Sequence, residues 1–448
     1  MRMPHMAERG PELPMQRDLI DRSNASLKAR LALDLESLRG SLQRSGTLLA
    51  LDTTLEEIMD RVAGFEVVLP SWGLGTGGTR FGRFPGPGEP TSVFEKLEDA
   101  ALVQQLTRGA GAVSLHVPWD SGASRALSEC AQGLGLRFDA MNSNTFQDQP
   151  GQRLSYKFGS LSHPESAVRR QAIDHNLEVI AIGEAIGSKA LSVWIGDGSD
   201  TPGQSNFRRS LERVADSLAE IYKSLPGDWK LFVEYKPYEP AFYSTVIQDW
   251  GTALHLCQGL GDRAHVLVDL GHHLPGTNIE QIVSRLIQVG RLGGVHLNDS
   301  KYGDDDLTAG SIRPFQLFLI FCELVAAERE ARKSRQMSAP TYLIDQSHNT
   351  RDPIEALIVT VEEARRAYAK ALFVDFERLA ELQDASDPVL AELVLKNAFE
   401  TDVRPVLAAV RLRDGGAIDP IGIFRESGYR LAKARERKPD WKTAGGMV

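Results

Sequence analysis

Cysteine is scarce in this chain of 448 residues, which contains three: Cys130, Cys257 and Cys322. They are odd in number, far apart and without CxxC spacing, so they predict neither a disulfide framework nor a thiolate metal site. Small buried thiols in a reducing compartment are the simplest interpretation. We therefore expect a cytoplasmic protein.

Long apolar runs and an excess of positive charge are also lacking. No stretch reaches the roughly 18 apolar residues that a membrane span requires. The opening MRMPHMAERGPELPMQRD is polar and contains prolines, so we expect no signal peptide. Lysine and arginine number 51 against 60 acidic residues, a net charge of −9. Nucleic acids and anionic membranes bind basic surfaces, so neither is expected as a partner.

Eight short apolar runs, separated by helical patterns, dominate residues 63–350. Each run is almost continuously apolar, as expected for a strand that is buried on both faces. Eight strands alternating with helices predict an α/β fold, an eight-stranded parallel (β/α)8 TIM barrel, with a doubly wound open sheet as the alternative. The runs are FEVVLPSW (65–72), AVSLHVPW (112–119), FDAMNSN (138–144), ALSVWIG (190–196), KLFVEYK (230–236), HVLVDLGHH (265–273), GGVHLND (293–299) and TYLIDQSH (341–348).

Helices are expected in the chain both before and after the barrel. Leucines at 27, 31, 35, 38 and 42 lie on one helical stripe, which predicts an N-terminal helical segment over 21–62 after a disordered stretch, 1–20. Helical patterns continue over 351–430 and predict a C-terminal extension that takes part in subunit packing. The basic, polar end, 431–448, is expected to be a tail.

Nearly every apolar run ends in a polar or aromatic side chain. The carboxyl ends of barrel strands form one rim, where the active sites of such barrels lie. One solvated strand end is ordinary, but eight together predict a functional mouth. The residues concerned are Trp72, His116, Trp119, Asn142, Asn144, Trp194, Glu234, Lys236, Asp269, His272, His296, Asn298 and Asp345.

The acids and histidines at these strand ends, together with Asp304 and Asp306 in the stretch after the seventh run, predict a metal site. Five carboxylates exceed the charge that one divalent ion can neutralise, which favours two ions. Oxygen-rich sites with some imidazole suit Mn²⁺, Mg²⁺ or Co²⁺, and the lack of thiolates argues against a structural zinc site. The candidate ligands are Glu234, Asp269, His272, His296, Asp304, Asp306 and Asp345.

The stretch VHLNDSKYGDDDLTAG (295–310) contributes part of this set. By itself, a triple aspartate is typical of a solvated turn. In an extended chain, Asp304 and Asp306 would project to one side and Asp305 to the other. Glu234 and Lys236 share a strand face in the same way, as a simple ion pair or as a metal ligand beside a cation that neutralises oxyanion charge.

A glycine-rich motif at 73–78 satisfies GxGxxG, the dinucleotide-binding pattern. That function requires a helix to begin at the glycines. Prolines at 85, 87 and 90 exclude such a helix. We expect a glycine loop that carries Arg80 and Phe81 instead.

Several long motifs together resemble one family: PSWGLGTGGTRF (70–81), SLHVPWD (114–120), FDAMNSNTF (138–146), NDSKYGDDDLTAG (298–310) and IDQSHN (344–349). They are similar to bacterial L-rhamnose isomerase, in particular to the pseudomonad-type enzymes of broad aldose specificity, which are relatives of xylose isomerase. The resemblance implies a homotetrameric aldose–ketose isomerase. Its substrates would be small-molecule monosaccharides, namely L-rhamnose and aldoses such as L-mannose, L-lyxose and D-allose. Two Mn²⁺ ions are implied, with Co²⁺, Mg²⁺ or Zn²⁺ as other options.

The resemblance also assigns roles to residues. Glu234, Asp269, His296 and Asp345 would hold a structural metal ion, and Asp269, His272, Asp304 and Asp306 a catalytic one. Substrate contacts would come from Trp72, His116, Phe146, Trp194 and Lys236, and from Phe81 of a neighbouring subunit. Where relatives have a histidine between the glutamate and the lysine, this chain has Tyr235, which we expect to point away from the mouth.

The implied reaction is a metal-assisted 1,2-hydride shift, with Lys236, His116, Asp304 and Asp306 as the catalytic residues. An enediol route remains an alternative. So do a single-metal ketose epimerase or another metal-dependent sugar enzyme on the same barrel, and a non-catalytic binding protein. A barrel endonuclease would need a basic face, which this acidic chain lacks. Neither the preferred aldose nor the physiological metal follows from the sequence.

Overall fold

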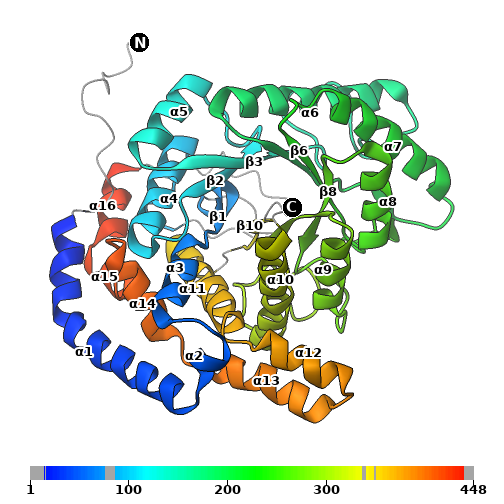
Figure 1. The fold of residues 1–448 in the computed structure, drawn as a ribbon. Helices are drawn as coiled ribbons and strands as arrows, with labels where there is room; N and C mark the ends of the chain where they lie inside the picture. The colour runs from blue at the N-terminus through cyan, green and yellow to red at the C-terminus, as the bar shows by residue number, and fades with distance from the viewer. Residues whose placement is uncertain (1–14, 16, 76–85, 335–339, 348–349, 438–448) are drawn as a thin grey trace.

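Eight parallel strands form a closed barrel in the computed structural model, which describes residues 15, 17–75, 86–334, 340–347 and 350–437 (Figure 1). Around the barrel the strands follow the order β1-β10-β9-β8-β6-β4-β3-β2. Each strand lies within one of the predicted apolar runs or begins one residue before it. The predicted barrel is therefore confirmed. The strands are β1 (Val68–Pro70), β2 (Ala112–Val117), β3 (Arg137–Ser143), β4 (Ala190–Val193), β6 (Lys230–Glu234), β8 (Ala264–Asp269), β9 (Leu292–Leu297) and β10 (Thr341–Ile344).

One helix follows each barrel strand and packs on the outside. The last of them, α11, packs against both α10 and α4 and so closes the ring of helices. The barrel therefore extends beyond the expected boundary at 350. The helices are α4 (Val93–Thr107), α5 (Ser124–Gly133), α6 (Ser166–Ile186), α7 (Phe207–Lys223), α8 (Trp250–Leu260), α9 (Ile279–Gln288), α10 (Pro314–Ser334) and α11 (Pro353–Ala371).

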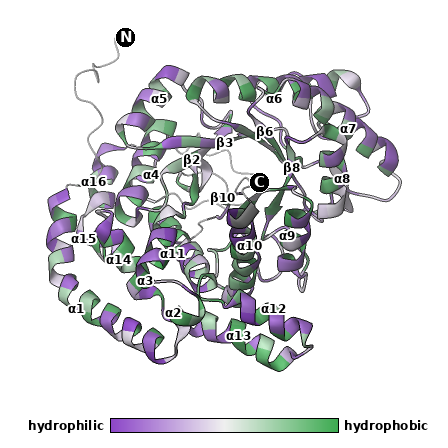
Figure 2. Cartoon of the chain, viewed as in Figure 1, coloured by the Kyte–Doolittle hydropathy of each residue, from purple (hydrophilic) through white to green (hydrophobic). Residues whose placement is uncertain are grey.

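The barrel interior has an apolar layer beneath a polar one. Because side chains alternate along a strand, an inward residue is followed by another inward residue two positions later. The apolar layer consists of Val68, Ala112, Ala140, Ala190, Phe232, Leu267 and Leu343. Two positions after six of these come Ser114, Asn142, Ser192, Glu234, Asp269 and Asp345. The main core lies outside the barrel, between strands and helices, whose outward faces are hydrophilic (Figure 2).

The terminal helices pack together beside the barrel (Figure 1). They are α1 (Arg17–Arg44), α2 (Thr47–Ala50), α3 (Leu55–Gly64), α12 (Phe376–Asp384), α13 (Pro388–Glu400), α14 (Arg404–Arg413), α15 (Pro420–Glu426) and α16 (Tyr429–Glu436). The short helix η1 (Ser71–Gly73) directly follows β1 instead. Helix α1 begins at Arg17 and buries Ile20, so order starts before the expected residue 21. Helix α16 likewise enters the expected tail, and Arg437 after it donates to Asp99 Oδ1 at 2.8 Å. None of the described helices is long and apolar enough to cross a membrane.

The two ends of the barrel differ in chemistry. A cavity of about 1410 Å³ opens at the amino-terminal end, where Val68, Arg137, Lys230 and Thr341 line it. At the carboxyl-terminal end, a small antiparallel sheet joins β5 (Gly198–Ser199) to β7 (Ser244–Thr245). The polar strand ends gather at this second end, as the sequence predicted.

Candidate metal and sugar site

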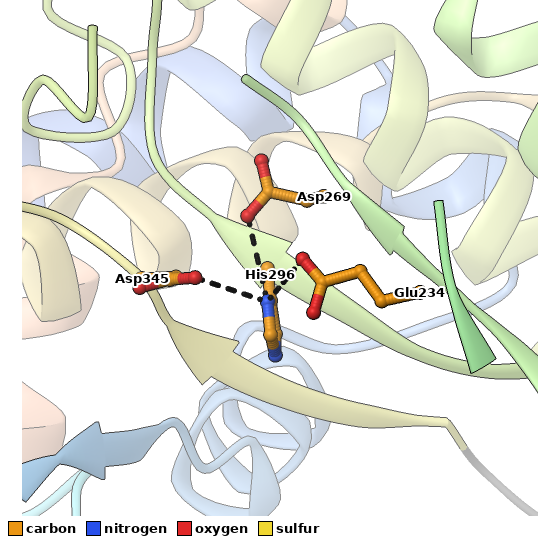
Figure 3. A group of neighbouring side chains, drawn as sticks. All are labelled: Glu234, Asp269, His296 and Asp345. Atoms are coloured by element: carbon orange, nitrogen blue, oxygen red, sulfur yellow. Dashed lines mark ion pairs between the residues drawn. The ribbon is translucent and has the colours of Figure 1, made fainter. Parts of the chain in front are cut away.

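Four side chains from four neighbouring strand ends converge in the barrel mouth (Figure 3). They are Glu234 on β6, Asp269 on β8, His296 on β9 and Asp345 just after β10. The Nδ1 atom of His296 lies 3.3 Å from Glu234 Oε1, 3.4 Å from Asp269 Oδ2 and 3.3 Å from Asp345 Oδ2. Neither ring nitrogen of this buried histidine forms a hydrogen bond within the described part of the chain. The arrangement provides the donor atoms that a divalent cation binds.

A second group shares Asp269 with the first and adds His272 and Asp304. A tight turn after β8 positions His272 beside Asp269: the backbone N–H groups of Gly271 and His272 donate to Asp269 Oδ1 at 2.7 and 3.2 Å. Nδ1 of His272 lies 3.0 Å from the carbonyl oxygen of Tyr235, and its Nε2 lies 3.4 Å from Asp304 Oδ1. Such a contact to one ring nitrogen orients the other nitrogen toward a ligand.

Burial and charge compete strongly in these two groups. Burial by itself would lower the pKa values of His272 and His296, but the surrounding carboxylates raise both well above the usual value. Burial raises the pKa of Asp269, whereas the two imidazoles lower that of Glu234 despite its burial. Protons on the imidazoles thus offset part of the acidic charge. A divalent cation would take the place of those protons, since metal binding releases protons from its ligands.

Asn298 holds the shared aspartate, a role that the sequence did not reveal. Its Nδ2 donates to both carboxylate oxygens of Asp269, at 3.0 and 3.2 Å, and to the carbonyl oxygen of Asp345 at 2.9 Å. A Cβ atom on Gly271 would come within 3.2 Å of that amide, so glycine leaves room for it. The strand-end position of Asn298 was the only available signal.

The acidic loop after β9 divides its carboxylates among different tasks. The carboxylate of Asp299 accepts the backbone N–H groups of Ile312 and Arg313 at 2.8 and 2.9 Å. The backbone of Asp299 pairs with Leu307 through two hydrogen bonds of 2.8 Å and so closes the loop. Asp305 Oδ2 accepts the backbone N–H groups of Lys301 and Tyr302, as in the solvated turn considered above. Asp304 is buried in the second ligand group.

Asp306 is not a member of either ligand group found among the described residues. Its φ of +50° is left-handed, so the extended geometry that we assumed for Asp304 and Asp306 is wrong. The hydroxyl of Ser347 donates to Asp306 Oδ2 at 3.1 Å, and the Ser347 N–H donates to its carbonyl oxygen. The loop therefore turns between the two acids, and Asp306 faces the end of β10.

Lys236 lies beside the second ligand group. Its Nζ is 2.5 Å from Asp304 Oδ2 and also forms an ion pair with Glu239. The same atom lies 5.3 Å from the centre of the Trp194 ring, within the range of a cation–π interaction. Glu239 is a residue that our sequence reasoning missed.

Aromatic rings line the opposite side of the mouth. His116 stacks on Trp119, with centroids 4.2 Å apart, and meets Trp72 and Phe146 edge-on at 5.5 and 5.6 Å. Phe146 in turn lies 4.7 Å from Trp194. The Trp72 indole donates to Asp345 Oδ1 at 2.9 Å, which connects this wall to the first ligand group. Phe81, the substrate contact that we expect from a neighbouring subunit, lies outside the described residues.

The pKa of His116 is lowered to about 4, mainly by burial, so its ring is neutral near pH 7. In the unfolded chain, histidine titrates near 6.5, so the unfolded state binds more protons between pH 6.5 and 4. His116 therefore costs the folded state about 3 kcal/mol as the pH falls through this window. Between pH 7 and 4, the free energy of unfolding measured with urea should therefore fall less in His116→Asn than in the wild type, by about the same 3 kcal/mol. Equal losses in both proteins would contradict this assignment.

Tyr235 lies on the outer face of the barrel, in the main core. Its hydroxyl is 2.7 Å from Nε2 of His273, whose pKa is lowered to about 3, first by burial and then by the neighbouring His272. The Tyr235–His273 contact thus ties the end of β6 to the turn after β8 without entering the mouth.

Tyr235→Phe leaves a buried imidazole nitrogen without this partner, which costs about 1–3 kcal/mol. We expect that loss in urea unfolding, with kcat/KM within about twofold because the mouth keeps its residues. A tenfold loss of kcat/KM in a protein of unchanged stability would show that the pair controls the site.

The barrel and its acidic mouth agree with the comparisons to known proteins. Residues 101–316 match the family model described as "Xylose isomerase-like TIM barrel". A structure of L-ribulose 3-epimerase has the same fold, with a TM-score of 0.52 at 15% identity, covering 72% of this chain and 99% of that one. The fold and site together define a barrel of this class.

Two curated relatives extend over nearly the whole chain. A "Probable sugar isomerase" of Rhizobium meliloti (strain 1021) is 55% identical over 437 residues, 97% of this chain and 100% of the relative. Another of Mesorhizobium japonicum is 54% identical over 431 residues, 96% of this chain and 98% of the relative. The chain belongs to the same family as these two probable sugar isomerases, and residues 101–316 form its xylose isomerase-like barrel region.

Proposed function

We propose that this protein is a metal-dependent aldose–ketose isomerase that converts L-rhamnose to L-rhamnulose and also accepts related aldoses. The observation that carries the proposal is the pair of ligand groups that share Asp269, beside Lys236 and an aromatic wall. The names of the two full-length relatives support a sugar isomerase. The motifs that resemble L-rhamnose isomerase support the choice of sugar.

The donor set fits two divalent ions, and Mn²⁺ is our first choice. Glu234, Asp269, His296 and Asp345 would hold one ion. Asp269, His272 and Asp304 would hold the other, with Asp306 as the further ligand that the resemblance implies. When bound, such ions polarise a carbonyl and lower the pKa of a hydroxyl, which contributes several kcal/mol to catalysis.

The remaining residues would bind the open-chain sugar and handle its charge. In the reaction, a hydrogen moves with its electron pair from C2 to C1, while a proton moves from O2 to O1. The Lys236 ammonium would stabilise negative charge on these oxygens, and a carboxylate of Asp304 or Asp306 would hold the proton in transit. Neutral His116 would hydrogen-bond to O5, while Trp72, Phe146 and Trp194 would cover the apolar faces of the sugar.

Metal-free protein provides the direct test. The whole chain is stripped with EDTA and incubated with L-rhamnose, with and without Mn²⁺, and ketose is assayed. We expect ketose only after Mn²⁺ is restored. Absence of metal-dependent ketose from L-rhamnose, L-mannose, L-lyxose and D-allose would reject the isomerase.

Deuterium oxide separates the two routes for hydrogen transfer. A direct hydride shift keeps the substrate hydrogen, so the product made in D₂O should carry no deuterium at C1. An enediol intermediate would exchange that hydrogen with solvent. Deuterium at C1 in the NMR spectrum would therefore replace the hydride shift by the enediol route.

A single-metal ketose epimerase is the second candidate. The second ligand group, with His272 and Asp304, favours two ions and hence the isomerase. An epimerase would change the configuration of a ketose without forming an aldose. Product analysis with L-rhamnulose as substrate distinguishes the two, because the isomerase should form L-rhamnose.

We further propose a homotetramer in which the C-terminal helices take part in subunit packing. Helix α13 exposes Val389, Leu390 and Leu393 in the single chain, as an interface helix would before assembly. Light scattering after size-exclusion chromatography measures the mass in solution. A monomer at micromolar concentration would reject the tetramer without affecting the reaction proposed above.

A further inference from the structure

Two carboxylates from different loops compete for one buried lysine. Asp304 lies in the loop after β9 and Glu239 in the loop after β6, and both form ion pairs with Lys236 Nζ. The side chains of Lys236 and Asp304 are each 2% exposed, and that of Glu239 is 14% exposed. Interactions of charges at this depth are screened far less by water than those at the surface.

The two carboxylates differ in what else they can bind. Asp304 belongs to the ligand group with Asp269 and His272, whereas Glu239 belongs to neither group found among the described residues. A cation held by Asp304 and the Lys236 ammonium would thus share one carboxylate and repel each other. Glu239 offers the lysine an acceptor that the cation does not use.

The Tyr238 side chain connects the loops of the two carboxylates and so keeps both acceptors within reach of Lys236. The hydroxyl of Tyr238 accepts the Asp304 N–H at 2.7 Å and donates to the Gly271 carbonyl at 3.3 Å. A Cβ atom on Gly303 would lie 3.2 Å from the Tyr238 ring, so glycine permits this close packing. Tyr238 therefore joins the loops that carry Glu239, Asp304 and the turn after β8.

The backbone of the lysine is fixed as well. Its N–H donates to Ile247 O at 2.9 Å, and its carbonyl oxygen accepts the Thr245 hydroxyl. With both loops and the strand end held, the ammonium can change partner by side-chain rotation alone.

We propose that Glu239 is a positioning residue: it holds the Lys236 ammonium beside the sugar site and leaves Asp304 to the cation. The inference rests on the proposed two-metal site and deepens it. Without Glu239, the ammonium pairs with Asp304 alone and competes with the cation for that carboxylate. By pairing with Lys236, Glu239 thus leaves the Asp304 carboxylate available and promotes metal binding.

The test is Mn²⁺ titration of the metal-free full chain by calorimetry in four proteins: wild type, Glu239→Gln, Lys236→Met and the double variant. Asp304→Asn identifies the binding step that belongs to the second ligand group. We expect Glu239→Gln to weaken that step by about 10- to 100-fold, as substitutions beyond the direct ligands commonly do. In the Lys236→Met background, the same substitution should have almost no effect, because the Lys236 ammonium that competes with Mn²⁺ for Asp304 is absent.

Three further measurements separate positioning from damage to the fold. Glu239→Asp should recover part of the affinity, and circular dichroism should show unchanged unfolding temperatures. The activity that Glu239→Gln loses at low Mn²⁺ should return at high Mn²⁺.

Each other outcome has a definite meaning. An unchanged Mn²⁺ affinity in Glu239→Gln overturns the inference. So does an equal loss in the Lys236→Met background, because Glu239 would then act on the cation by its own charge. Wild type that binds fewer than two ions overturns the proposed two-metal function itself, and this is visible without any variant.

Discussion

Asp269→Asn is expected to abolish isomerisation and to reduce the binding of both metal ions. Asp269 is fully buried and belongs to both ligand groups, so one substitution removes a carboxylate from each. Asparagine keeps the volume and an acceptor for the N–H of Gly271 but not the charge. Because metal ions contribute several kcal/mol to such reactions, we expect turnover to fall by about 10³-fold or more.

Bound metal, measured by elemental analysis after dialysis, should decrease together with ketose formation. Asp305→Asn is a matched control, since Asp305 lies in the acidic loop after β9 and, within the described part of the chain, accepts the turn N–H groups of Lys301 and Tyr302 without joining either ligand group. It should keep near-normal turnover. An Asp269→Asn protein that still binds two ions and turns over at a tenth of the normal rate would remove Asp269 from the proposed centre.

Lys236→Met should lower kcat by about 10²–10³-fold while the metal ions stay bound. The ammonium lies in the mouth against Asp304 and over the Trp194 ring, where it would meet the negative charge that develops on the sugar oxygens. Loss of one such buried group typically costs this factor. Methionine retains the length of the side chain, so the packing against Trp194 should be preserved.

Steady-state kinetics at saturating Mn²⁺ measure this effect. Lys189→Met is the control, because Lys189 forms an ion pair with Asp228 at the exposed surface. It should leave kcat unchanged. A rise in KM with normal kcat in Lys236→Met would show that the lysine binds the substrate and the transition state equally, which would contradict a catalytic role.

The barrel was predictable because its strands carry a local signal. Strands buried on both faces are apolar along most of their length, as in AVSLHV and HVLVD, and this pattern is visible in the sequence without knowledge of the neighbouring strands. The limits of the barrel were harder to predict. Helix α11 has the same helical pattern as the extension that follows it, and only its packing against α10 and α4 makes it the eighth barrel helix.

The candidate site was predictable wherever a residue occupies a strand end. Glu234, Asp269, His296 and Asp345 follow apolar runs, and the parallel barrel brings such ends to one rim. Residues in the loops carried no comparable signal. Glu239 lies five residues beyond the end of β6, and nothing in its neighbourhood along the chain indicates an ion pair with Lys236.

The sequence by itself therefore determined the eight strands, the end of the barrel where the polar side chains gather and most of the acids and imidazoles found there, because alternation along a strand is a property of the local chain. Only the tertiary structure decided how the acidic loop divides its carboxylates. The left-handed backbone at Asp306 and the contact of Tyr238 with Asp304 place one acid in the ligand group and turn the other toward Ser347. Loop conformation depends on contacts between segments far apart in the chain, and such contacts leave no periodic pattern in the sequence.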